Sequence, residues 1–247
     1  MRVFVTGSKG FIGTHLMNRL VYEGHDAIGY DLKDGNDILD KNRLSVLMKG
    51  AEYVVHLAAE KSVPKSWEDP AVFFKTNILG TLEVFKAALD CKVKRVIVAS
   101  SSSAHQTLSP YSVSKKGSEM VAKMFWDVHN VESICLRFFN VFGPGQPLNG
   151  AYSAVVPKFI DAIKRGEPPC IYGSGNQYRD FTYVDNVVEA VILAIRSETL
   201  PFGAYVDIGT GNPHTVLDLL SEISDAMGKP MPVPNLLPDR LGDIQYS

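Results

Sequence analysis

A tyrosine and a lysine stand four residues apart, at Tyr111 and Lys115. Because positions i and i+4 share one face of a helix, the two side chains are expected to lie together. A free phenol has a pKa near 10, and an adjacent cation would stabilise the phenolate and lower that value. The pair is therefore a candidate for base catalysis, with an ordinary surface pair as the simpler alternative.

Four serines, 100–103, follow the apolar segment RVIVA at 95–99. If that segment is a strand of a parallel sheet, the serines stand at its carboxyl end, where such sheets bind ligands. A serine there could hydrogen-bond a reacting hydroxyl. A flexible loop is the alternative interpretation of the same run.

A glycine-rich stretch, with Gly7, Gly10 and Gly13, connects the β-branched segment RVFVT at 2–6 to a helical pattern. Such a turn lets the backbone approach a pyrophosphate, and the helix N-terminus offers free N–H groups. Asp31 follows Gly13 by 18 residues, close to the spacing at which a carboxylate binds the adenosine ribose. The pattern predicts NAD rather than NADP, although Lys33 leaves NADP open, and an ordinary turn with a solvated aspartate is the alternative.

β-rich and helical segments alternate through the first 140 residues, which indicates a parallel sheet covered on both faces. Strands are expected at 2–6, 26–30, 53–57, 95–99 and 133–138, and helices at 11–23, 71–90 and 109–129. The prediction is a doubly wound α/β (Rossmann) domain at 1–140 that binds NAD. A smaller substrate-binding lobe is expected at 141–247, interleaved with the first, with helices at 155–165, 185–197 and 216–227.

Composition narrows the class of protein. Of the 247 residues, 45% are hydrophobic and 21% are charged, which predicts a packed globular fold. The net charge of −2 argues against nucleic-acid and membrane-surface binding. Three widely separated cysteines predict neither a disulfide framework nor a metal site. Because no apolar run reaches ~18 residues and a strand is expected at the N-terminus, we expect a cytoplasmic protein.

The motifs together resemble the extended short-chain dehydrogenase/reductase family, in particular its nucleotide-sugar epimerases and dehydratases. They occur in the family's order and span nearly the whole chain. The motifs are TGSKGFIG (6–13), HLAA (56–59), SVPKS (62–66), NILGT (77–81), PYSVSK (110–115), LRFFNVFGPG (136–145), NGAYSAVVPKF (149–159) and GSGNQYRDFTYVDN (173–186).

The resemblance implies a role for each matching residue. Tyr111 would be the catalytic base, Lys115 its partner and a ligand of the nicotinamide ribose, and Ser101 the catalytic hydroxyl. The other cofactor-binding residues would be Gly7, Gly10, Phe11, Ile12, Gly13, Asp31, Asp37, Ile38, Leu57, Ala58, Ala59, Lys61, Asn77 and Phe138. The substrate-binding residues would be Ser62, Val63, Ser101, Ser102, Asn140, Val155, Val156, Tyr172, Arg179, Arg240 and Ser247. Among them, Asn140, Arg179 and Arg240 would hold the nucleotide diphosphate.

The serine run helps to separate the reactions of this family. At this point the sequence of related 4,6-dehydratases resembles Thr-Asp-Glu, and decarboxylases carry a glutamate nearby. Residues 101–103 of this chain contain no acid. We therefore expect NAD-dependent epimerisation of a UDP-hexose at C4 through a 4-keto intermediate, most similar to the UDP-glucose and UDP-N-acetylglucosamine 4-epimerases. A dehydratase, decarboxylase or reductase of the same family remains an alternative, as does a non-catalytic NAD-binding protein of the same fold.

Two features depart from the family pattern. The connection between the serines and Tyr111 is short and runs through His105 and Gln106. The chain also ends at Ser247, where relatives continue, so we expect a truncated or naturally short protein. The family pattern places Ser247 at the wall of the sugar pocket, and its small side chain predicts room for an N-acetyl group. Relatives pair through the helices expected at 71–90 and 109–129, so a homodimer is expected.

Overall fold

Six parallel strands form the central sheet of the first of two compact units. A computed structural model describes residues 1–148, 154–239, 241–242 and 244–247. Unit 1 comprises Met1–Phe138 and Val184–Ile208, and unit 2 comprises Phe139–Tyr183 and Gly209–Ser247. The strands of unit 1 are β1 (Arg2–Thr6), β2 (Asp26–Tyr30), β3 (Tyr53–His56), β4 (Arg95–Ser101), β5 (Glu132–Phe138) and β10 (Ala204–Ile208).

The strand order is β10-β5-β4-β3-β1-β2, and every neighbouring pair is parallel. The chain leaves β1 in one direction across the sheet and later returns to build it in the other. The carboxyl ends of β1 and β3 therefore flank the point where the order reverses, the usual ligand site of an open α/β sheet. The predicted doubly wound α/β fold is confirmed.

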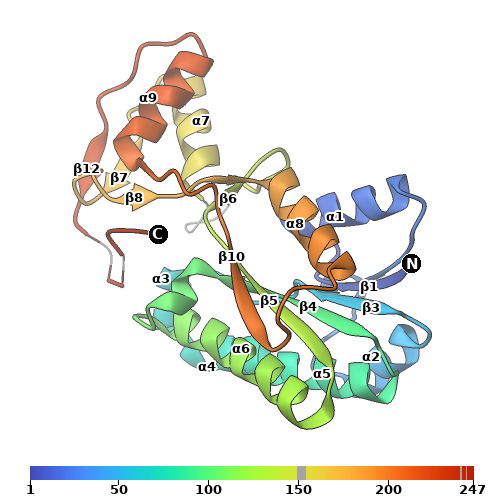
Figure 1. Ribbon diagram of the computed structural model, residues 1–247. Helices are drawn as coiled ribbons and strands as arrows, with labels where there is room; N and C mark the ends of the chain where they lie inside the picture. The colour runs from blue at the N-terminus through green and yellow to red at the C-terminus, as the bar shows by residue number, and fades with distance from the viewer. Residues whose placement is uncertain (149–153, 240, 243) are drawn as a thin grey trace. The chain divides into compact units, whose positions relative to one another are not determined.

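Helices cover both faces of this sheet, as Figure 1 shows. Helices α1 (Phe11–Tyr22) and α8 (Val184–Arg196) pack together on one face. The other face carries α2 (Lys41–Met48), α5 (Gly80–Asp90) and α6 (Pro110–His129). Their apolar sides bury Val84, Phe85 and Phe125 against strand residues such as Val96, because both faces of a parallel sheet must be shielded from water.

Some elements differ from the sequence expectation. The helix expected at 71–90 is present but is not α-helical throughout: α4 (Pro70–Phe73) leads into a π-helix, η2 (Phe74–Leu79), and then into α5. Helix α2 and the short helix α3 (Val63–Glu68) were not expected. Strand β10 and helix α8 belong to unit 1, although the sequence pattern grouped them with the second lobe. The reason is that β10 pairs with β5 across a long sequence separation.

The described residues of unit 2 form short strands and two helices, α7 (Val155–Arg165) and α9 (Val216–Ala226). Its core contains Phe159, Ile163, Ile171 and Leu220. The strand pairs are β6 (Val141–Phe142) with β9 (Thr182–Tyr183), β7 (Cys170–Tyr172) with β12 (Asn235–Leu237), and β8 (Tyr178–Arg179) with β11 (His214–Thr215).

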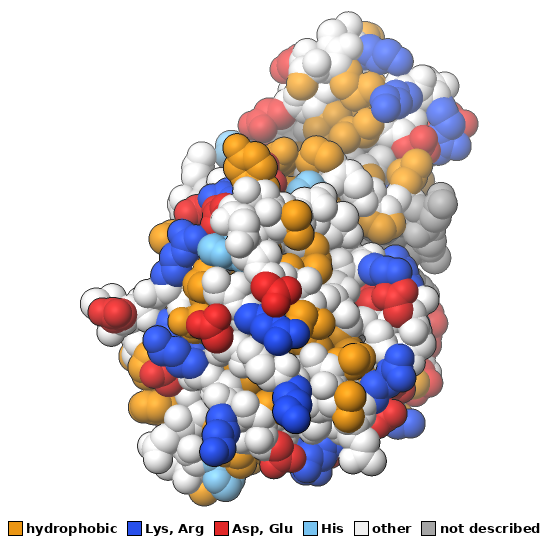
Figure 2. Space-filling model, turned by 90° about the vertical axis from the view of Figure 1, so that its right-hand side faces the viewer, with side chains coloured by type: hydrophobic (Ala, Val, Ile, Leu, Met, Phe, Trp, Pro, Cys, Tyr) orange, Lys and Arg blue, Asp and Glu red, His pale blue; other side chains and the backbone are white. Residues whose placement is uncertain are grey.

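The surface carries mixed charge. On the face shown in Figure 2, basic and acidic side chains are interspersed with no broad region of one sign, as the net charge of −2 suggests. Within the ranges that the structure describes, no helix combines the length and the apolar character needed to cross a membrane.

Candidate active site

The loop after β1, here called the glycine cradle, requires glycine at two positions, Gly7 and Gly13. Gly7 has a φ of +70°, and a Cβ there would lie 2.7 Å from the Ala58 backbone nitrogen. A Cβ on Gly13 would lie 2.1 Å from the Gly7 carbonyl oxygen, so α1 packs directly on the turn. Gly10 precedes α1 and supplies no side-chain cap, and the first turn holds no acidic residue. The free N–H groups and the helix dipole therefore suit an anionic phosphate.

Asp31 lies at the end of β2, beside this loop, and its side chain is buried. Its carboxylate accepts hydrogen bonds from the backbone nitrogens of Lys9 (2.8 Å) and Lys33 (2.9 Å). A carboxylate has about four lone-pair positions, so capacity remains for two ribose hydroxyls. The Lys33 ammonium donates to the Lys9 carbonyl oxygen at 2.9 Å, and the Lys9 ammonium forms an ion pair with Asp34. Both lysines near Asp31 thus have partners of their own.

The remaining residues predicted to bind the cofactor lie along the same edge of unit 1. Asp37 accepts from the Leu39 backbone nitrogen at 2.9 Å, whereas Ile38 is buried against the core. Leu57, Ala58 and Ala59 follow β3 and are half-buried, Lys61 is exposed, and Phe138 at the end of β5 is buried. Phe11 and Ile12 are half-buried at the start of α1.

Ser101, Tyr111 and Lys115 lie at the carboxyl end of β4 and the start of α6. The Ser101 hydroxyl lies near enough to the Tyr111 hydroxyl to lower the pKa of Tyr111. The Lys115 ammonium is buried and donates to the Ala99 carbonyl oxygen at 2.8 Å. Helix α6 begins at this point because Ser109 and Ser112 form a reciprocal capping box and Pro110 occupies the first helical turn.

The titration of this group differs from the expectation. Burial raises the pKa of Tyr111, and the hydrogen bond with Ser101 only partly opposes that rise. Burial also lowers the pKa of Lys115 to about 8. The sequence argument counted the ammonium as the stabiliser of a phenolate but could not weigh desolvation, which penalises both charged forms. The chain's own groups therefore hold Tyr111 as a neutral phenol.

Asn77 organises the backbone around this site. It lies in the π-helix η2 and is 1% exposed. Its side-chain amide exchanges hydrogen bonds with the backbone of Glu60, at 2.8 and 3.0 Å. The amide also donates to the Ser114 hydroxyl at 2.8 Å, and this hydroxyl donates to the Tyr111 carbonyl oxygen. Asn77 thus ties the loop after β3 to the first turn of α6.

His56, at the end of β3, is a buried polar residue that the sequence analysis did not single out. Its ring nitrogens lie 2.7 Å from the Thr6 hydroxyl and 3.0 Å from the Thr81 hydroxyl. Burial, assisted by the nearby Lys115 charge, lowers the pKa of His56 to about 3. The ring is therefore neutral and links the ends of β1 and β3 to α5.

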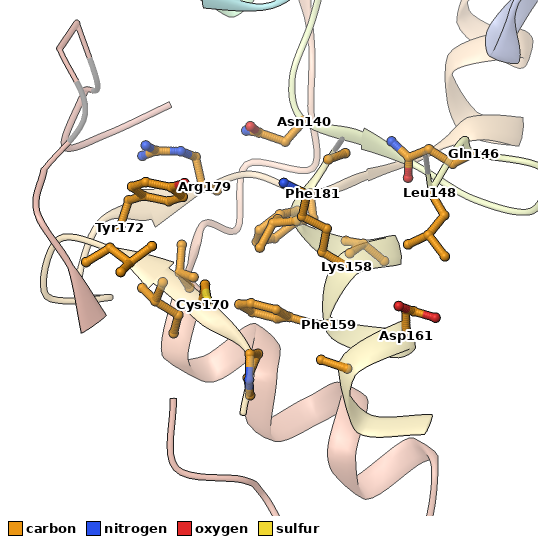
Figure 3. A pocket seen from close by; sticks show the side chains of 18 of the residues that line it. Asn140, Gln146, Leu148, Lys158, Phe159, Asp161, Cys170, Tyr172, Arg179 and Phe181 are labelled. Carbon is orange, nitrogen blue, oxygen red and sulfur yellow. The ribbon is translucent and has the colours of Figure 1, made fainter. Parts of the chain in front are cut away.

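Unit 2 holds a cavity of about 770 Å³. Five residues predicted to bind substrate line it: Asn140, Val155, Val156, Tyr172 and Arg179. Figure 3 shows Asn140 and Arg179 at one end, the Phe159 ring in the middle and Asp161 toward the other end. An arginine and an amide beside apolar rings provide the chemistry that a nucleoside diphosphate requires.

Ser247 is held firmly within unit 2. Its carbonyl oxygen accepts from the Asp180 backbone nitrogen at 2.6 Å, and its backbone nitrogen donates to Tyr178 at 3.2 Å. The Asn140 amide donates to the Ser247 hydroxyl at 3.2 Å. Ser247 therefore lies beside one of the cavity-lining residues, whereas Arg240 lies outside the described residues.

The other predicted substrate-binding residues lie in unit 1. Ser62 precedes α3 with a φ of 101°, and its hydroxyl accepts from the Lys65 backbone nitrogen. Val63 begins that helix, and Ser102 is buried after β4. A positive φ at a non-glycine residue is strained, and such strain is concentrated at functional sites.

Several cavity-lining residues were missed by sequence reasoning. Gln146, Lys158, Phe159, Cys170 and Phe181 all line the cavity. Gln146 directly follows the motif ending in Gly145, and Lys158 and Phe159 lie inside the motif at 149–159. Their place in those motifs was the available signal. No residues within the described ranges form a cluster of three or more His, Cys, Asp or Glu suited to a metal ion.

The sheet, the glycine cradle and the Ser-Tyr-Lys group define a dinucleotide-dependent enzyme of the short-chain dehydrogenase/reductase class. The family model "NAD dependent epimerase/dehydratase family" matches residues 3–209. The chain belongs to this family, so NAD is its cofactor.

Individual relatives agree with this assignment. The UDP-glucose 4-epimerase of Mycolicibacterium smegmatis is 31% identical, with alignment over 100% of this chain and 89% of the relative. The UDP-N-acetylglucosamine 4-epimerase structure from Methanobrevibacter ruminantium M1, in complex with UDP-N-acetylmuramic acid, has a TM-score of 0.91 at 34% identity and covers 100% and 88% of the two chains. A UDP-N-acetyl-alpha-D-glucosaminuronate decarboxylase of Bacillus cytotoxicus is also similar, at 30% identity over 90% and 79% of the two chains.

Proposed function

We propose that the chain is an NAD-dependent UDP-hexose 4-epimerase. The observation that carries the proposal is the group of Ser101, Tyr111 and Lys115 at a strand end and the start of α6, with no carboxylic acid in the serine run. A hydroxyl pair can move one proton to and from a sugar hydroxyl, whereas elimination of water needs an additional acid-base pair. Oxidation and reduction at a single carbon is the reaction that this set of groups supports.

In this mechanism Tyr111 removes the proton of the sugar 4-hydroxyl while Ser101 hydrogen-bonds the same oxygen. NAD, when bound, would supply the hydride acceptor and donor for C4, and its positively charged ring would favour the Tyr111 phenolate. Lys115 would add a second cation and hold the nicotinamide ribose. The 4-keto sugar would present its other face before it is reduced, and Tyr111 would return its proton, so that no net oxidation occurs.

The fit of the cofactor follows from the residues present. The cradle at Gly7 and Gly13 excludes any Cβ and leaves the uncapped N-terminus of α1 for the pyrophosphate. The buried Asp31 carboxylate retains acceptor positions for the adenosine ribose. Arg179 and Asn140, on the cavity of unit 2, are proposed to hold the diphosphate of the UDP-sugar.

The test is to incubate the protein with NAD and a panel of UDP-hexoses and to look for a C4-inverted product by NMR. Tyr111→Phe should bind NAD normally but lose turnover by about 10²- to 10⁴-fold, because a positioned acid-base group contributes that much. Near-wild-type turnover in this variant would exclude the mechanism. Net oxidation, loss of CO₂ or loss of water would instead indicate a reductase, a decarboxylase or a dehydratase, and NAD binding without turnover a non-catalytic protein.

We further propose that both UDP-glucose and UDP-N-acetylglucosamine are accepted. The small side chain of Ser247, fixed beside Asn140, supports this because a short residue cannot exclude an acetamido group by filling its space. Ser247→Tyr should lower kcat/KM for the acetylated sugar relative to UDP-glucose. An unchanged ratio would show that Ser247 is not a pocket wall, and native turnover of UDP-glucose alone would refute the acetylated substrate.

A homodimer is also proposed, paired through α6. Its exposed side carries Val113, Met120, Met124 and Val128, which fall on one stripe of the helix. Met120→Lys should shift the molar mass measured by light scattering from dimer to monomer. Val46→Lys is a matched control, because Val46 is equally exposed but lies on α2.

A further inference from the structure

A short turn connects the catalytic strand to the catalytic helix. The 3₁₀-helix η3 (Ser102–His105) begins directly after Ser101, which is its N-cap. The Ser101 hydroxyl accepts a hydrogen bond from the Ser103 backbone nitrogen at 3.2 Å. This bond occupies a lone pair of the hydroxyl and so limits the directions in which its proton can point. The orientation of Ser101 therefore depends on the conformation of residues 102–105.

A buried ion pair lies beneath this turn. Arg137 on β5 donates two hydrogen bonds to Glu119 on α6, at 2.6 and 2.7 Å, and both side chains are buried. The Ser100 hydroxyl donates to the same carboxylate at 2.7 Å. Burial would raise the pKa of Glu119, but the bonds from Arg137 and Ser100 outweigh it and hold the pKa below its ordinary value. The residue before Ser101 is thus fixed to a charged, well-bonded pair.

The far end of the turn is fixed to the same pair through His105. The Arg137 guanidinium lies 3.0 Å from His105 Nδ1, and His105 Nε2 lies 2.8 Å from an oxygen of Asp207 on β10. The same guanidinium nitrogen also lies 3.3 Å from Nε2. Because the Asp207 carboxylate can only accept, Nε2 carries a proton, which leaves Nδ1 to accept from Arg137. The Tyr205 ring, also on β10, meets the His105 ring edge-on at 5.8 Å and stacks on Arg137 at 3.3 Å.

From this geometry we propose that His105, supported by Asp207, is a positioning residue that directs the Ser101 hydroxyl toward Tyr111 and the sugar. The proposal rests on the roles given above to Ser101 and Tyr111. Ser100 and His105 hold the two ends of the turn, and both reach the Glu119–Arg137 pair. Ser101 lies between these two attachments, so its orientation changes if either is lost.

A purely structural role would have a different consequence. The side chains of His105 and Asp207 are 39% and 46% exposed, and a polar contact at that exposure contributes little to global stability. The buried part of the network, Glu119 and Arg137, remains intact without His105. Removing His105 should therefore affect the catalytic turn far more than the stability of the fold.

The first test compares His105→Ala with the native protein. We expect kcat to fall by about 10- to 100-fold, because a displacement of about 1 Å can cost about 10²-fold. KM for the UDP-sugar and the Kd for NAD should stay within about twofold. His105→Gln, which can both accept and donate, should recover most of the loss. His129→Ala, an exposed histidine at the end of α6, should leave kcat and stability unchanged.

The second test asks whether His105 acts through Ser101. In a double-mutant cycle, His105→Ala should reduce kcat by less than about twofold once Ser101→Ala is present. The Tyr111 ionisation, followed in the NAD complex as the ultraviolet difference from Tyr111→Phe, should move to higher pH in both single variants. This shift is expected because the hydrogen bond from Ser101 lowers the Tyr111 pKa.

Native kcat in His105→Ala, or full multiplication of the two losses in the double variant, would overturn the proposal. The spectroscopic measurement needs no sugar and so separates the two hypotheses. If no UDP-hexose is converted but His105→Ala still shifts the Tyr111 ionisation, the proposed function fails and the positioning role stands. If the sugar is converted and neither kcat nor the ionisation changes, the positioning role fails alone.

Discussion

Two buried arginines in unit 1 lie at the two ends of neighbouring parallel strands, one at the amino ends and one at the carboxyl ends. Arg95 is the first residue of β4, and Arg137 is the penultimate residue of the neighbouring β5. Each pairs with a glutamate, Glu132 or Glu119, and each stacks on an aromatic ring that lies in or just before β10. The same chemistry thus occurs at the amino end and at the carboxyl end of one sheet.

The two arginines use their remaining hydrogen bonds differently. Arg95 donates to the carbonyl oxygens of Ala194, Ile195 and Ser197, at 2.9, 2.9 and 2.6 Å. These carbonyls lie at the C-terminal end of α8, where the helix leaves its last acceptors unpaired. Arg95 therefore completes a helix, whereas Arg137 supports the turn that carries Ser101. The comparison shows that a buried charge can serve stability or function, depending on what its spare donors reach.

The largest effect is expected from Arg137→Met. The Glu119 side chain, 7% exposed, would be left as a buried carboxylate without its main partner, which costs about 3–5 kcal/mol of the free energy of unfolding. Activity per folded molecule should also fall, because the catalytic turn loses its support. Urea denaturation and kcat at a temperature where the variant is folded are the measurements. An unchanged kcat would contradict a functional role for Arg137 at the carboxyl end of the sheet.

Arg95→Met should cost less stability and no activity. Its partner Glu132 is 28% exposed and can be rehydrated, while three helix carbonyls lose a charged donor. We expect a loss of about 1.5–3 kcal/mol in the free energy of unfolding, the range for hydrogen bonds to charged groups. A loss of kcat in Arg95→Met as large as that in Arg137→Met would contradict the difference between the two arginines.

His56, at the carboxyl end of the sheet, should also make the folding stability fall at acid pH. The pKa of His56 is about 3 in the folded chain and about 6.5 in an unfolded chain. The unfolded state therefore binds more protons between these values, so the stability that His56 contributes is present above pH ~6.5 and is lost as the pH falls, by about 1.4 kcal/mol per unit. His56→Gln keeps a donor and an acceptor for the two threonines and should flatten this dependence. An equally steep loss in that variant would assign the effect to other groups.

The smallest effect concerns cofactor choice at the end of β2. Asp31→Asn removes the charge that repels a 2′-phosphate and keeps only one of the two oxygens that accept from the backbone nitrogens of Lys9 and Lys33. Binding titrations should show NAD held about tenfold more weakly, about 1.4 kcal/mol, and NADP held more tightly than in the native chain. Native protein that binds NADP as tightly as NAD would show that Asp31 does not select the cofactor.

Local patterns predicted much of the fold. Periodicity predicted five of the six sheet strands and the helices α1, α6, α7, α8 and α9. Each of these elements has its apolar pattern within one short, continuous segment of the sequence. Strand β10 was not expected, since its residues alternate between half-buried and exposed at a sheet edge and its partner β5 is remote in sequence. The π-helical part of the helix predicted at 71–90 was also missed, because the hydrogen bonds of a π-helix leave no mark on hydrophobic periodicity.

The candidate site shows the same division. The glycine cradle, Asp31 and the Tyr111–Lys115 pair are local motifs. In the structure each lies at the helix or strand end where it was expected. Burial raises the pKa of Tyr111 in the chain itself, and sequence reasoning could weigh the neighbouring cation but not this burial, which is a property of the packed fold. The contact of His105 with Asp207 joins residues 102 positions apart. Sequence reasoning noticed only the shortness of the connection that contains His105 and could not identify what holds it.

The π-helix at Phe74–Leu79 has a consequence for how the gene can change. A π turn amounts to one residue inserted into an α-helix, and here the Asn77 carbonyl oxygen accepts from the Thr81 and Ser118 hydroxyls. Deleting any one codon of this segment would let a regular helix run from α4 into α5. The deletion would remove the wider π turn that contains Asn77, and with it the position from which the Asn77 side chain bonds Glu60 and Ser114. This segment should therefore tolerate substitutions at its exposed positions but not a change in length.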